Sequence, residues 1–248
     1  NKVVTRTEPL AGGKTRVILG PSPFLKKIRP KDEKEIELRA DKVLVTIGRD
    51  SKIRDLGLEA LGIELDPAGW IKANEKMETN IPGVYAVGDA LGPEKVMLAH
   101  AASMEAIIAA ENALGGDRVM NYDRIPTGIF TFPEIAGVGV TEAQAEERGF
   151  EFRSDTFLLR GLGKSQAMGR IAGQTKIISH VKTGKILGVH IVGPHASDLI
   201  AEAALALEMG ATAKDLASTI HVHPTLSEAM SETAYAALDM PFHPKTKL

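Results

Sequence analysis

The sequence has no cysteine among its 248 residues, which excludes a disulfide scaffold, a thiolate metal site and a thiol nucleophile of its own. It also has no apolar run of membrane-spanning length, and its first residues, Asn1-Lys2-Val3-Val4, do not form a signal peptide. We therefore expect no contact with a membrane and a cytoplasmic location.

Neither sign of charge is in excess, since 30 Lys and Arg residues face 32 Asp and Glu residues, for a formal net charge of -2. The two signs are evenly mixed, so the sequence predicts no nucleic-acid partner. With 44% hydrophobic residues, a chain of this length can bury a core in one or two domains.

Glycine motifs for nucleotide binding are absent as well. No Gly-x-Gly-x-x-Gly occurs, and the nearest runs, Gly137-Val-Gly139 and Gly161-Leu-Gly163, lack a third glycine at the right spacing. A complete dinucleotide fold therefore cannot be assembled from these residues. Asn1 to Thr7 reads as the middle of a strand with no initiator methionine, which favours the interpretation that the chain is part of something longer.

The first residues of the chain show strand patterns. Lys14–Leu19 and Glu35–Arg39 alternate apolar and polar residues, as is typical of a half-exposed antiparallel sheet, and Gly12-Gly13 predicts a turn. Lys42–Ile47 is almost continuously apolar up to Gly48, which predicts a strand covered on both faces, as in an α/β sheet.

Residues 50 to 94 contain only short elements, with strands expected at Trp70–Lys72 and Val84–Val87, and Lys95–Leu114 then predicts one long helix. From Ile125 the pattern is strands with a few helices at their ends, which predicts an α+β domain built on an antiparallel sheet. The expected strands are Thr127–Phe132, Ile135–Val140, Glu151–Leu159, Gly173–Ser179 and Ile186–Val192. The expected helices are Thr141–Arg148, Ser197–Met209, Thr212–Ser218 and Leu226–Leu238, with Thr141, Thr212 and Thr225 as their capping residues and Gln144 completing a capping box.

Two motifs carry chemistry. In Thr79-Asn-Ile-Pro-Gly-Val-Tyr-Ala-Val-Gly-Asp89, a short buried strand delivers Asp89 to its carboxyl end, where the carboxylate can accept hydrogen bonds from sugar or ribityl hydroxyls. Gly88 lets a ligand approach the backbone closely. The alternative is a purely structural role, a strand followed by an Asp turn, and it is less favoured for so long a motif.

The second motif is His221-Val-His-Pro-Thr-Leu-Ser-Glu228. Glu228 would accept a hydrogen bond from Nδ1–H of His223 and leave Nε2 free as a proton acceptor, which predicts a general base. A capping or core histidine is the alternative. The base has nothing to deprotonate in a chain without cysteine, so the motif looks like half of an active site.

The remaining candidates are set aside. His221 and His223 have the spacing of a chelating pair, but no third ligand lies at a useful distance, so we expect no metal site. His190 and His195 are interpreted as structural, and Ser227 lacks the elbow motif of a nucleophile.

Taken in order, these blocks resemble the pyridine nucleotide-disulfide oxidoreductases over essentially the whole chain. The blocks and their counterparts are Lys42–Arg49 (the strand closing the NAD domain), Thr79–Asp89 (the second FAD-binding motif), Met97–His100 (the start of the helix whose backbone meets the flavin ring), Thr131–Ala136 and Gly188–Pro194 (the dimerisation domain), and His221–Glu228 (the His-Glu pair best known in dihydrolipoamide dehydrogenases). The first FAD motif, the redox disulfide and the NAD glycine motif lie upstream in the family.

The resemblance implies a division into residues 1–49, the end of an NAD-binding domain, residues 50–122, the C-terminal segment of an FAD-binding domain, and residues 123–248, a dimerisation domain. The expected fold class is thus an α+β dimerisation domain preceded by trailing pieces of α/β domains. It implies FAD and NAD as cofactors, with the implied flavin-binding residues Asp89, Met97, Leu98, Ala99 and His100, and with Gly48 near the nicotinamide.

The resemblance also implies the reaction: a dithiol, dihydrolipoamide, is oxidised through an enzyme cystine and FAD, and NAD takes the hydride. His223 and Glu228 of one subunit of a homodimer would serve the flavin-disulfide site of the other, and a lipoyl domain of a 2-oxoacid dehydrogenase complex would be the substrate carrier. Leu226 favours this branch over glutathione reductases. Two departures are Gln166, where the family often has Arg, and the tail Phe242–Leu248, which has no derived role.

Two other readings stay open. One is a disulfide reductase similar to glutathione reductase. The other is a module without catalytic activity that dimerises and pairs with a separate flavin-binding chain. We expect the 248-residue chain alone to be inactive, since it has no cysteine to cycle.

Overall fold

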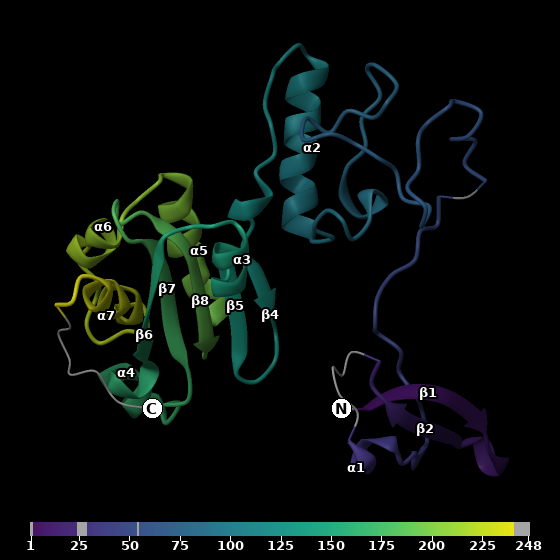
Figure 1. Cartoon of the computed structure of the whole chain (residues 1–248), viewed down its shortest axis with the longest axis horizontal. Helices are drawn as coiled ribbons and strands as arrows, with labels where there is room; N and C mark the ends of the chain where they lie inside the picture. The colour runs from purple at the N-terminus through teal and green to yellow at the C-terminus, as the bar shows by residue number, and fades with distance from the viewer. Residues whose placement is uncertain (1, 24–28, 54, 241–248) are drawn as a thin grey trace. The chain divides into compact units, whose positions relative to one another are not determined.

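The computed structural model divides the chain into two units, Asn1–Lys52 and Ile53–Leu248. It describes residues 2–23, 29–53 and 55–240, coloured from purple to yellow in Figure 1. The tail Phe242–Leu248, for which the sequence suggested no role, lies outside the described residues.

The first unit is a three-stranded antiparallel sheet in the order β1-β2-β3. Its strands are β1 (Lys2–Pro9), β2 (Thr15–Pro21) and β3 (Ile36–Ala40), with the short helix α1 (Pro30–Glu33) before the last strand. Alternation of apolar and polar residues predicted β2 and β3, and both are confirmed. The Gly12-Gly13 turn is confirmed too, because both glycines have the positive φ, 79° and 74°, that glycine adopts without strain.

The prediction of a doubly buried strand at Lys42–Ile47 is wrong. This segment has no regular structure, and Leu44 and Ile47 are 87% and 96% exposed. A strand covered on both faces needs a neighbouring strand and packing layers. No strand among residues 2–23, 29–53 and 55–240 pairs with this segment.

The second unit begins with a largely irregular stretch that packs on one helix, α2 (Ala99–Ala113). The strands expected at Trp70–Lys72 and Val84–Val87 are reduced to single bridges, Leu65 to Ile71 and Glu78 to Tyr85. Helix α2 starts at Ala99 rather than Lys95. The 3-10 turns η2 (Gly88–Leu91) and η3 (Tyr122–Arg124) flank it in sequence, and η2 packs against α2.

The rest of the unit is a five-stranded antiparallel sheet in the order β4-β5-β8-β7-β6 (Figure 1). Its strands are β4 (Thr127–Ile129), β5 (Glu134–Gly139), β6 (Phe152–Leu158), β7 (Gln174–His180) and β8 (Ile186–Gly193). The helices are α3 (Glu142–Glu147), α4 (Gly163–Met168), α5 (Ala196–Glu208), α6 (Ala213–Ser218) and α7 (Glu228–Ala237). All five predicted strands are present, so the α+β fold class is confirmed.

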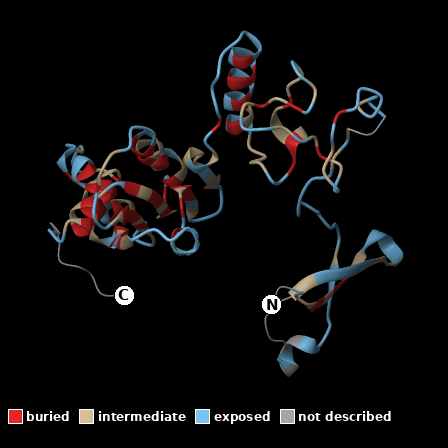
Figure 2. Ribbon diagram, turned by 45° about the horizontal axis from the view of Figure 1, so that its top comes forward, coloured by how far each residue is buried: buried red, intermediate tan, exposed pale blue. Residues whose placement is uncertain are grey.

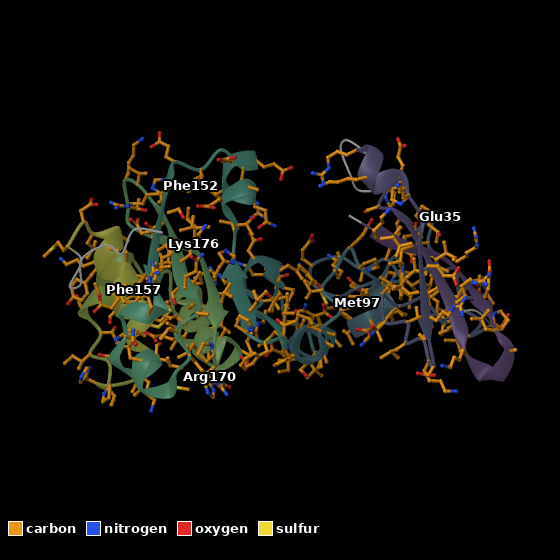
Figure 3. All side chains as sticks on the ribbon, turned by 90° about the horizontal axis from the view of Figure 1, so that it is seen from below. Glu35, Met97, Phe152, Phe157, Arg170 and Lys176 are labelled. Atoms are coloured by element: carbon orange, nitrogen blue, oxygen red, sulfur yellow. The ribbon has the colours of Figure 1, made fainter. Side chains whose placement is uncertain are left out.

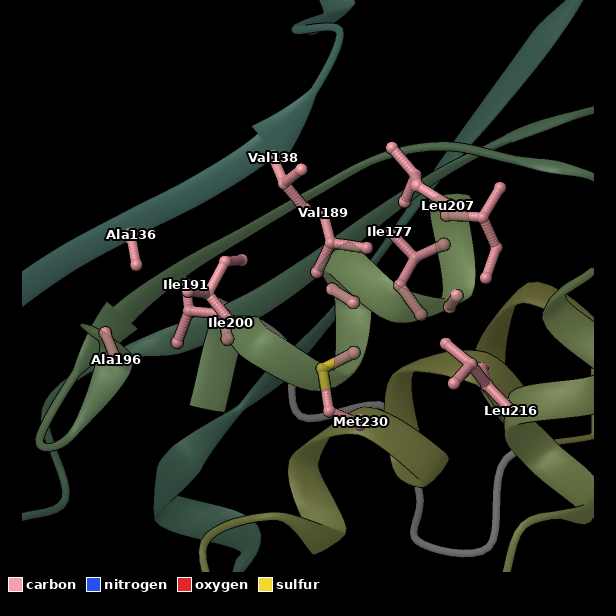
Figure 4. Close-up of a cluster of buried hydrophobic side chains, with 14 of the residues drawn as sticks. Ala136, Val138, Ile177, Val189, Ile191, Ala196, Ile200, Leu207, Leu216 and Met230 are labelled. Atoms are coloured by element: carbon pink, nitrogen blue, oxygen red, sulfur yellow. The ribbon is translucent and has the colours of Figure 1, made fainter. Parts of the chain in front are cut away.

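The sheet is covered on both faces, and the alternation of side chains along β7 shows how. Ile177 packs with residues of α5 and α7 in the main core, drawn in Figure 4, whereas its neighbour Ile178 packs with Ala145 of α3. Both isoleucines are 0% exposed. Figure 2 shows the buried residues concentrated in the sheet and these helices. Helices α5 and α7 therefore share one face of the sheet, and α3 covers the other.

Local signals set the starts of two helices in this domain, α3 and α6. Thr141 with Gln144 and Thr212 with Asp215 form capping boxes, and the first was predicted in full. Thr225 does not cap α7, which begins at Glu228 after Ser227. The hydroxyl of Thr225 instead donates to the Val222 carbonyl at 2.6 Å, and the carboxylate of Glu228 accepts from the Thr225 backbone N–H.

None of the described helices has the length and apolar character needed to cross a bilayer.

Candidate functional site

The pairing predicted for the HxHPTLSE motif is present. Nδ1 of His223 lies 2.8 Å from Oε1 of Glu228, the first residue of α7. The second carboxylate oxygen, Oε2, accepts a hydrogen bond from the backbone N–H of Thr225 at 2.8 Å. With both oxygens engaged, the carboxylate has a fixed orientation, and it fixes the imidazole in turn.

The two partners differ in exposure. The side chain of His223 is 76% exposed, whereas that of Glu228 is 20% exposed. Burial acts to raise the pKa of Glu228, but the hydrogen bonds from Thr225 and His223 outweigh it and hold the pKa below its ordinary value. An ionised Glu228 therefore accepts Nδ1–H, and no described residue hydrogen-bonds Nε2. The ring presents a proton acceptor to the outside of its own fold.

The second motif is placed by η2 and α2. Asp89 lies in the first turn of η2, directly after Gly88, whose φ is 71°. A Cβ on Gly88 would lie 3.3 Å from Cβ of Ala102, so the turn sits closely on α2. The backbone thus needs glycine here both for its conformation and for the close approach.

A residue that sequence reasoning missed supports this turn. Glu105 of α2 is 1% exposed, and its carboxylate accepts from the Gly88 N–H at 2.7 Å and from the Tyr122 hydroxyl at 2.8 Å. Burial, and next the bond to Glu105, raises the pKa of Tyr122 far above its ordinary value. A glutamate in a helix reads as a surface residue in sequence, so only the tertiary contacts reveal this role.

The Met97–His100 segment leads into α2, and Figure 3 labels Met97. Leu98 is the N-cap of α2 and gives no side-chain cap, so the first N–H groups of the helix have no capping acceptor on Leu98. His100 is anchored, since its Nε2 lies 2.8 Å from the Pro126 carbonyl. Uncapped donors at a helix N-terminus fit an electron-rich ring edge, and Asp89 fits a polyol, so these residues fit a flavin.

Gly48 belongs to the first unit, at the end of the exposed segment Lys42–Ile47. A Cβ added to it would meet no atom within 4 Å. Within the described residues it is not surrounded by groups that would bind a nicotinamide, so its role there stays a prediction.

Two other histidines of the sequence, His190 and His195, have partners within the described chain. Nε2 of His190 lies 3.0 Å from the Val140 carbonyl, and Nδ1 of His195 lies 3.4 Å from Asp198. His221 contacts Glu202 rather than His223, and no metal-binding cluster of His, Cys, Asp and Glu occurs among the described residues. Gln166, at the position where the sequence departs from the family, donates from Nε2 to the Arg160 carbonyl at 2.7 Å.

Comparison with protein-family models gives two matches. Residues 125–234 match the model described as pyridine nucleotide-disulphide oxidoreductase, dimerisation domain. Residues 14–106 match the model described as pyridine nucleotide-disulphide oxidoreductase. The two segments together take in most of the chain.

Two relatives with the same name match most of this chain. The chain is 44% identical over 207 residues to a dihydrolipoyl dehydrogenase of Thermus scotoductus, covering 84% of this chain and 44% of the relative. It is 45% identical over 201 residues to a mitochondrial dihydrolipoyl dehydrogenase of Mus musculus, covering 81% of this chain and 39% of the relative. The chain thus spans less than half the length of these relatives.

Solved structures share the fold. LpdA from Mycobacterium tuberculosis superposes with a TM-score of 0.82 at 29% identity, covering 95% of this chain and 48% of that one. The flavoprotein disulfide reductase RclA from Escherichia coli superposes with a TM-score of 0.77 over 94% of this chain and 50% of that one. Its identity of 22% makes the second likeness one of fold alone.

Proposed function

Because the chain belongs to the pyridine nucleotide-disulphide oxidoreductase family, we propose that it forms part of a flavin-dependent oxidoreductase that oxidises dihydrolipoamide and reduces NAD. In this proposal residues 1–49 end a NAD-binding domain, residues 50–122 belong to an FAD-binding domain, and residues 123–248 form the dimerisation domain. The identity to dihydrolipoyl dehydrogenases, 44% over 207 residues in the Thermus scotoductus relative, favours this substrate class.

The observation that carries the proposal is the His223–Glu228 pair. A thiol with an ordinary pKa of about 8.5 is mostly protonated at neutral pH, and only its thiolate is a good nucleophile. Nε2 of His223 takes the proton of the dithiol. Glu228 holds Nδ1–H at 2.8 Å and stabilises the imidazolium that forms, which keeps the proton on the base until it is released.

The flavin is assigned to the other motif. Asp89 would bind a hydroxyl of the FAD polyol, and the backbone at Met97, Leu98, Ala99 and His100 would face the ring. FAD, when bound, supplies a two-electron acceptor and donor between the disulfide and the nicotinamide. Glu105 acts on this site through the Gly88 N–H, 2.7 Å away, and so positions the turn that carries Asp89.

A homodimer follows from the exposure of the base. His223 is 76% exposed, and apolar side chains beside it in sequence are exposed as well, with Ile220 at 96% and Val222 at 73%. Leu205 and Met209 of the α5 end add to this exposed set, at 61% and 76%. A surface of this kind favours a partner. The dimerisation-domain match over residues 125–234 supports a second copy of the chain as that partner.

The test is an assay of the complete gene product that contains these residues. The proposal expects NAD reduction driven by dihydrolipoamide. Turnover with glutathione disulfide and a reduced nicotinamide, but not with dihydrolipoamide, would favour the reductase alternative. A product that carries no FAD and copurifies with a flavin-binding chain would favour the dimerisation module.

Two finer assignments belong to the same proposal. We assign the lipoyl domain of a 2-oxoacid dehydrogenase complex as the natural carrier of the dithiol, and cosedimentation of the complete protein with such a complex tests this. We also assign a cytoplasmic location, which cell fractionation tests directly.

A further inference from the structure

A second histidine–carboxylate pair involves a residue two positions before the proposed base. Nε2 of His221 lies 2.8 Å from Oε1 of Glu202 on α5, and its Nδ1 lies 2.9 Å from the Thr219 carbonyl. The side chain of His221 is 7% exposed, and that of Glu202 is 29% exposed. On sequence alone this histidine was considered only as a metal ligand, and that role was rejected.

Both ring nitrogens of His221 face oxygen acceptors. A carbonyl cannot donate, and an ionised carboxylate cannot donate either. The ring therefore acts as the donor, and its two nitrogens lie between the Glu202 carboxylate and the Thr219 carbonyl. A charge-assisted bond of this kind is among the stronger contacts that hold a loop.

The orientation of the loop supports a specific role for these bonds. His221 points inward, while its apolar neighbours Ile220 and Val222 are 96% and 73% exposed. Burial of apolar area alone favours the opposite arrangement, with the apolar side chains inside and the imidazole in water. The bonds from His221 to Glu202 and Thr219 therefore fix the side of the loop that faces outward.

We propose that the Glu202–His221 pair is a positioning unit for the base, which holds residues 219–223 so that His223 meets Glu228 and presents Nε2 outward. This inference rests on the proposed function for the role of His223. Glu202 acts from α5 and Glu228 from α7, so the loop is fastened at two points to two helices that pack on the same sheet.

The test uses the complete FAD-loaded enzyme with four variants. His221→Phe removes both bonds, Glu202→Gln removes the charge but keeps an acceptor, and His221→Gln keeps a donor toward Glu202. His195→Gln is the matched control, because His195 is an exposed histidine of the same domain whose contact with Asp198 is 3.4 Å long. Two activities are measured: NAD reduction by dihydrolipoamide, and NADH-driven reduction of ferricyanide, which needs no thiol base.

We expect His221→Phe to lower kcat with dihydrolipoamide by about 10-fold or more, the scale of a misplaced catalytic group, with KM and the ferricyanide reaction unchanged. Glu202→Gln and His221→Gln should lose less, and His195→Gln should match the unchanged enzyme. An equal fall in both activities, or unchanged kcat in His221→Phe and Glu202→Gln, overturns the positioning role.

A spectroscopic measurement tests the inference without an activity assay. Long-range nitrogen–proton spectra of the 248-residue chain report which ring nitrogen of His223 carries hydrogen. We expect Nδ1–H in the unchanged chain and a mixture of tautomers in Glu202→Gln, and an identical tautomer in both overturns the inference. If His223→Gln leaves dihydrolipoamide turnover unchanged, the proposed function of the base fails, and the positioning role fails with it. If His223→Gln lowers dihydrolipoamide turnover but the His221 and Glu202 variants do not, only the positioning role is contradicted.

Discussion

At the scale of single residues, the central feature is a carboxylate with both oxygens engaged next to an imidazole that is 76% exposed. Glu228 accepts from the Thr225 N–H and from His223, each at 2.8 Å, so it cannot rotate without losing one bond. This division of labour, with a fixed orienting group and an accessible acceptor, is what proton transfer to a base requires.

Replacing Glu228 by Gln should weaken the base without removing it. The amide oxygen can still accept Nδ1–H, but the amide NH2 cannot accept from the Thr225 N–H, and the charge that stabilises the imidazolium is lost. A difference of about 1.4 kcal/mol between the charged and neutral bond corresponds to roughly a 10-fold fall in kcat for dithiol oxidation. Steady-state kinetics of the complete enzyme measure this fall, and an unchanged kcat would mean that the charge of Glu228 does not act on His223.

At the scale of elements, the N-terminus of helix α5 is capped by a side chain of a strand. His195 precedes the helix in a left-handed conformation and gives no side-chain cap. Glu134 of β5 fills this place, since its Oε2 accepts from the hydroxyl and the N–H of Ser197 at 2.6 and 3.1 Å. These bonds, led by that from the Ser197 hydroxyl, hold the pKa of Glu134 below its ordinary value.

A lowered pKa in the folded state links this cap to pH. Glu134 stabilises the fold fully above its unfolded pKa of about 4.5, and the contribution is lost as pH falls through the lower folded pKa. Glu134→Gln should cost about 1 kcal/mol at neutral pH, as for a lost helix cap. Urea unfolding should also show a shallower loss of stability for Glu134→Gln than for the unchanged chain as pH falls from above about 4.5 through the lower folded pKa. Parallel losses would show that Glu134 does not carry the effect.

The elements also show what the sequence can predict. The capping box of Thr141 with Gln144 uses residues three apart, and the strands β2 and β3 follow from alternation along a few residues, so local patterns suffice for both. Lys42–Ile47 was predicted as a buried strand, and this failed because burial depends on neighbours that the segment itself does not encode. The predicted cap at Thr225 was wrong because its hydroxyl donates to the Val222 carbonyl and α7 begins only at Glu228.

The same distinction holds within the site. The His223–Glu228 pair is five residues apart and was predicted from the motif. Glu105 and the Glu202–His221 pair were not predicted, because their partners lie 17 and 19 residues away in sequence. Their residue types, a helical glutamate and a loop histidine, are common at surfaces.

At the scale of the whole molecule, one arginine fastens the edge of the five-stranded sheet to the chain after α7. Arg153 of β6 donates from Nε to Asp155 at 2.7 Å and from Nη1 to Asp239 at 2.8 Å. The side chain of Asp155 is 8% exposed, so its charge depends on this partner. The contact joins parts 86 residues apart in sequence and closes the domain that carries the base.

Arg153→Met should therefore lower the free energy of unfolding by about 3 kcal/mol, because it leaves a buried carboxylate without its cation. Arg148→Met is the control, since Arg148 pairs with Asp123 at the surface and such pairs contribute less than about 1 kcal/mol. Chemical denaturation of the two variants compares them directly. Equal losses would contradict the distinction between the buried and the exposed pair.

The whole molecule also explains why the proposed base lies in a domain without a flavin motif. His223 is exposed beside apolar side chains that are themselves exposed, and the chain contains no thiol. Proton transfer from sulfur therefore requires groups outside this chain, which the proposed dimer of the complete enzyme provides.

The most direct test of this account is rapid mixing of the complete, FAD-loaded enzyme and its His223→Gln variant with dihydrolipoamide. Flavin reduction by the dithiol should slow by about 100-fold or more in the variant, the scale of a lost general base. Reduction of the same flavin by NADH should keep its rate, because no thiol proton has to be removed. Dithiol-driven reduction at the unchanged rate would contradict the assignment of His223 as the base.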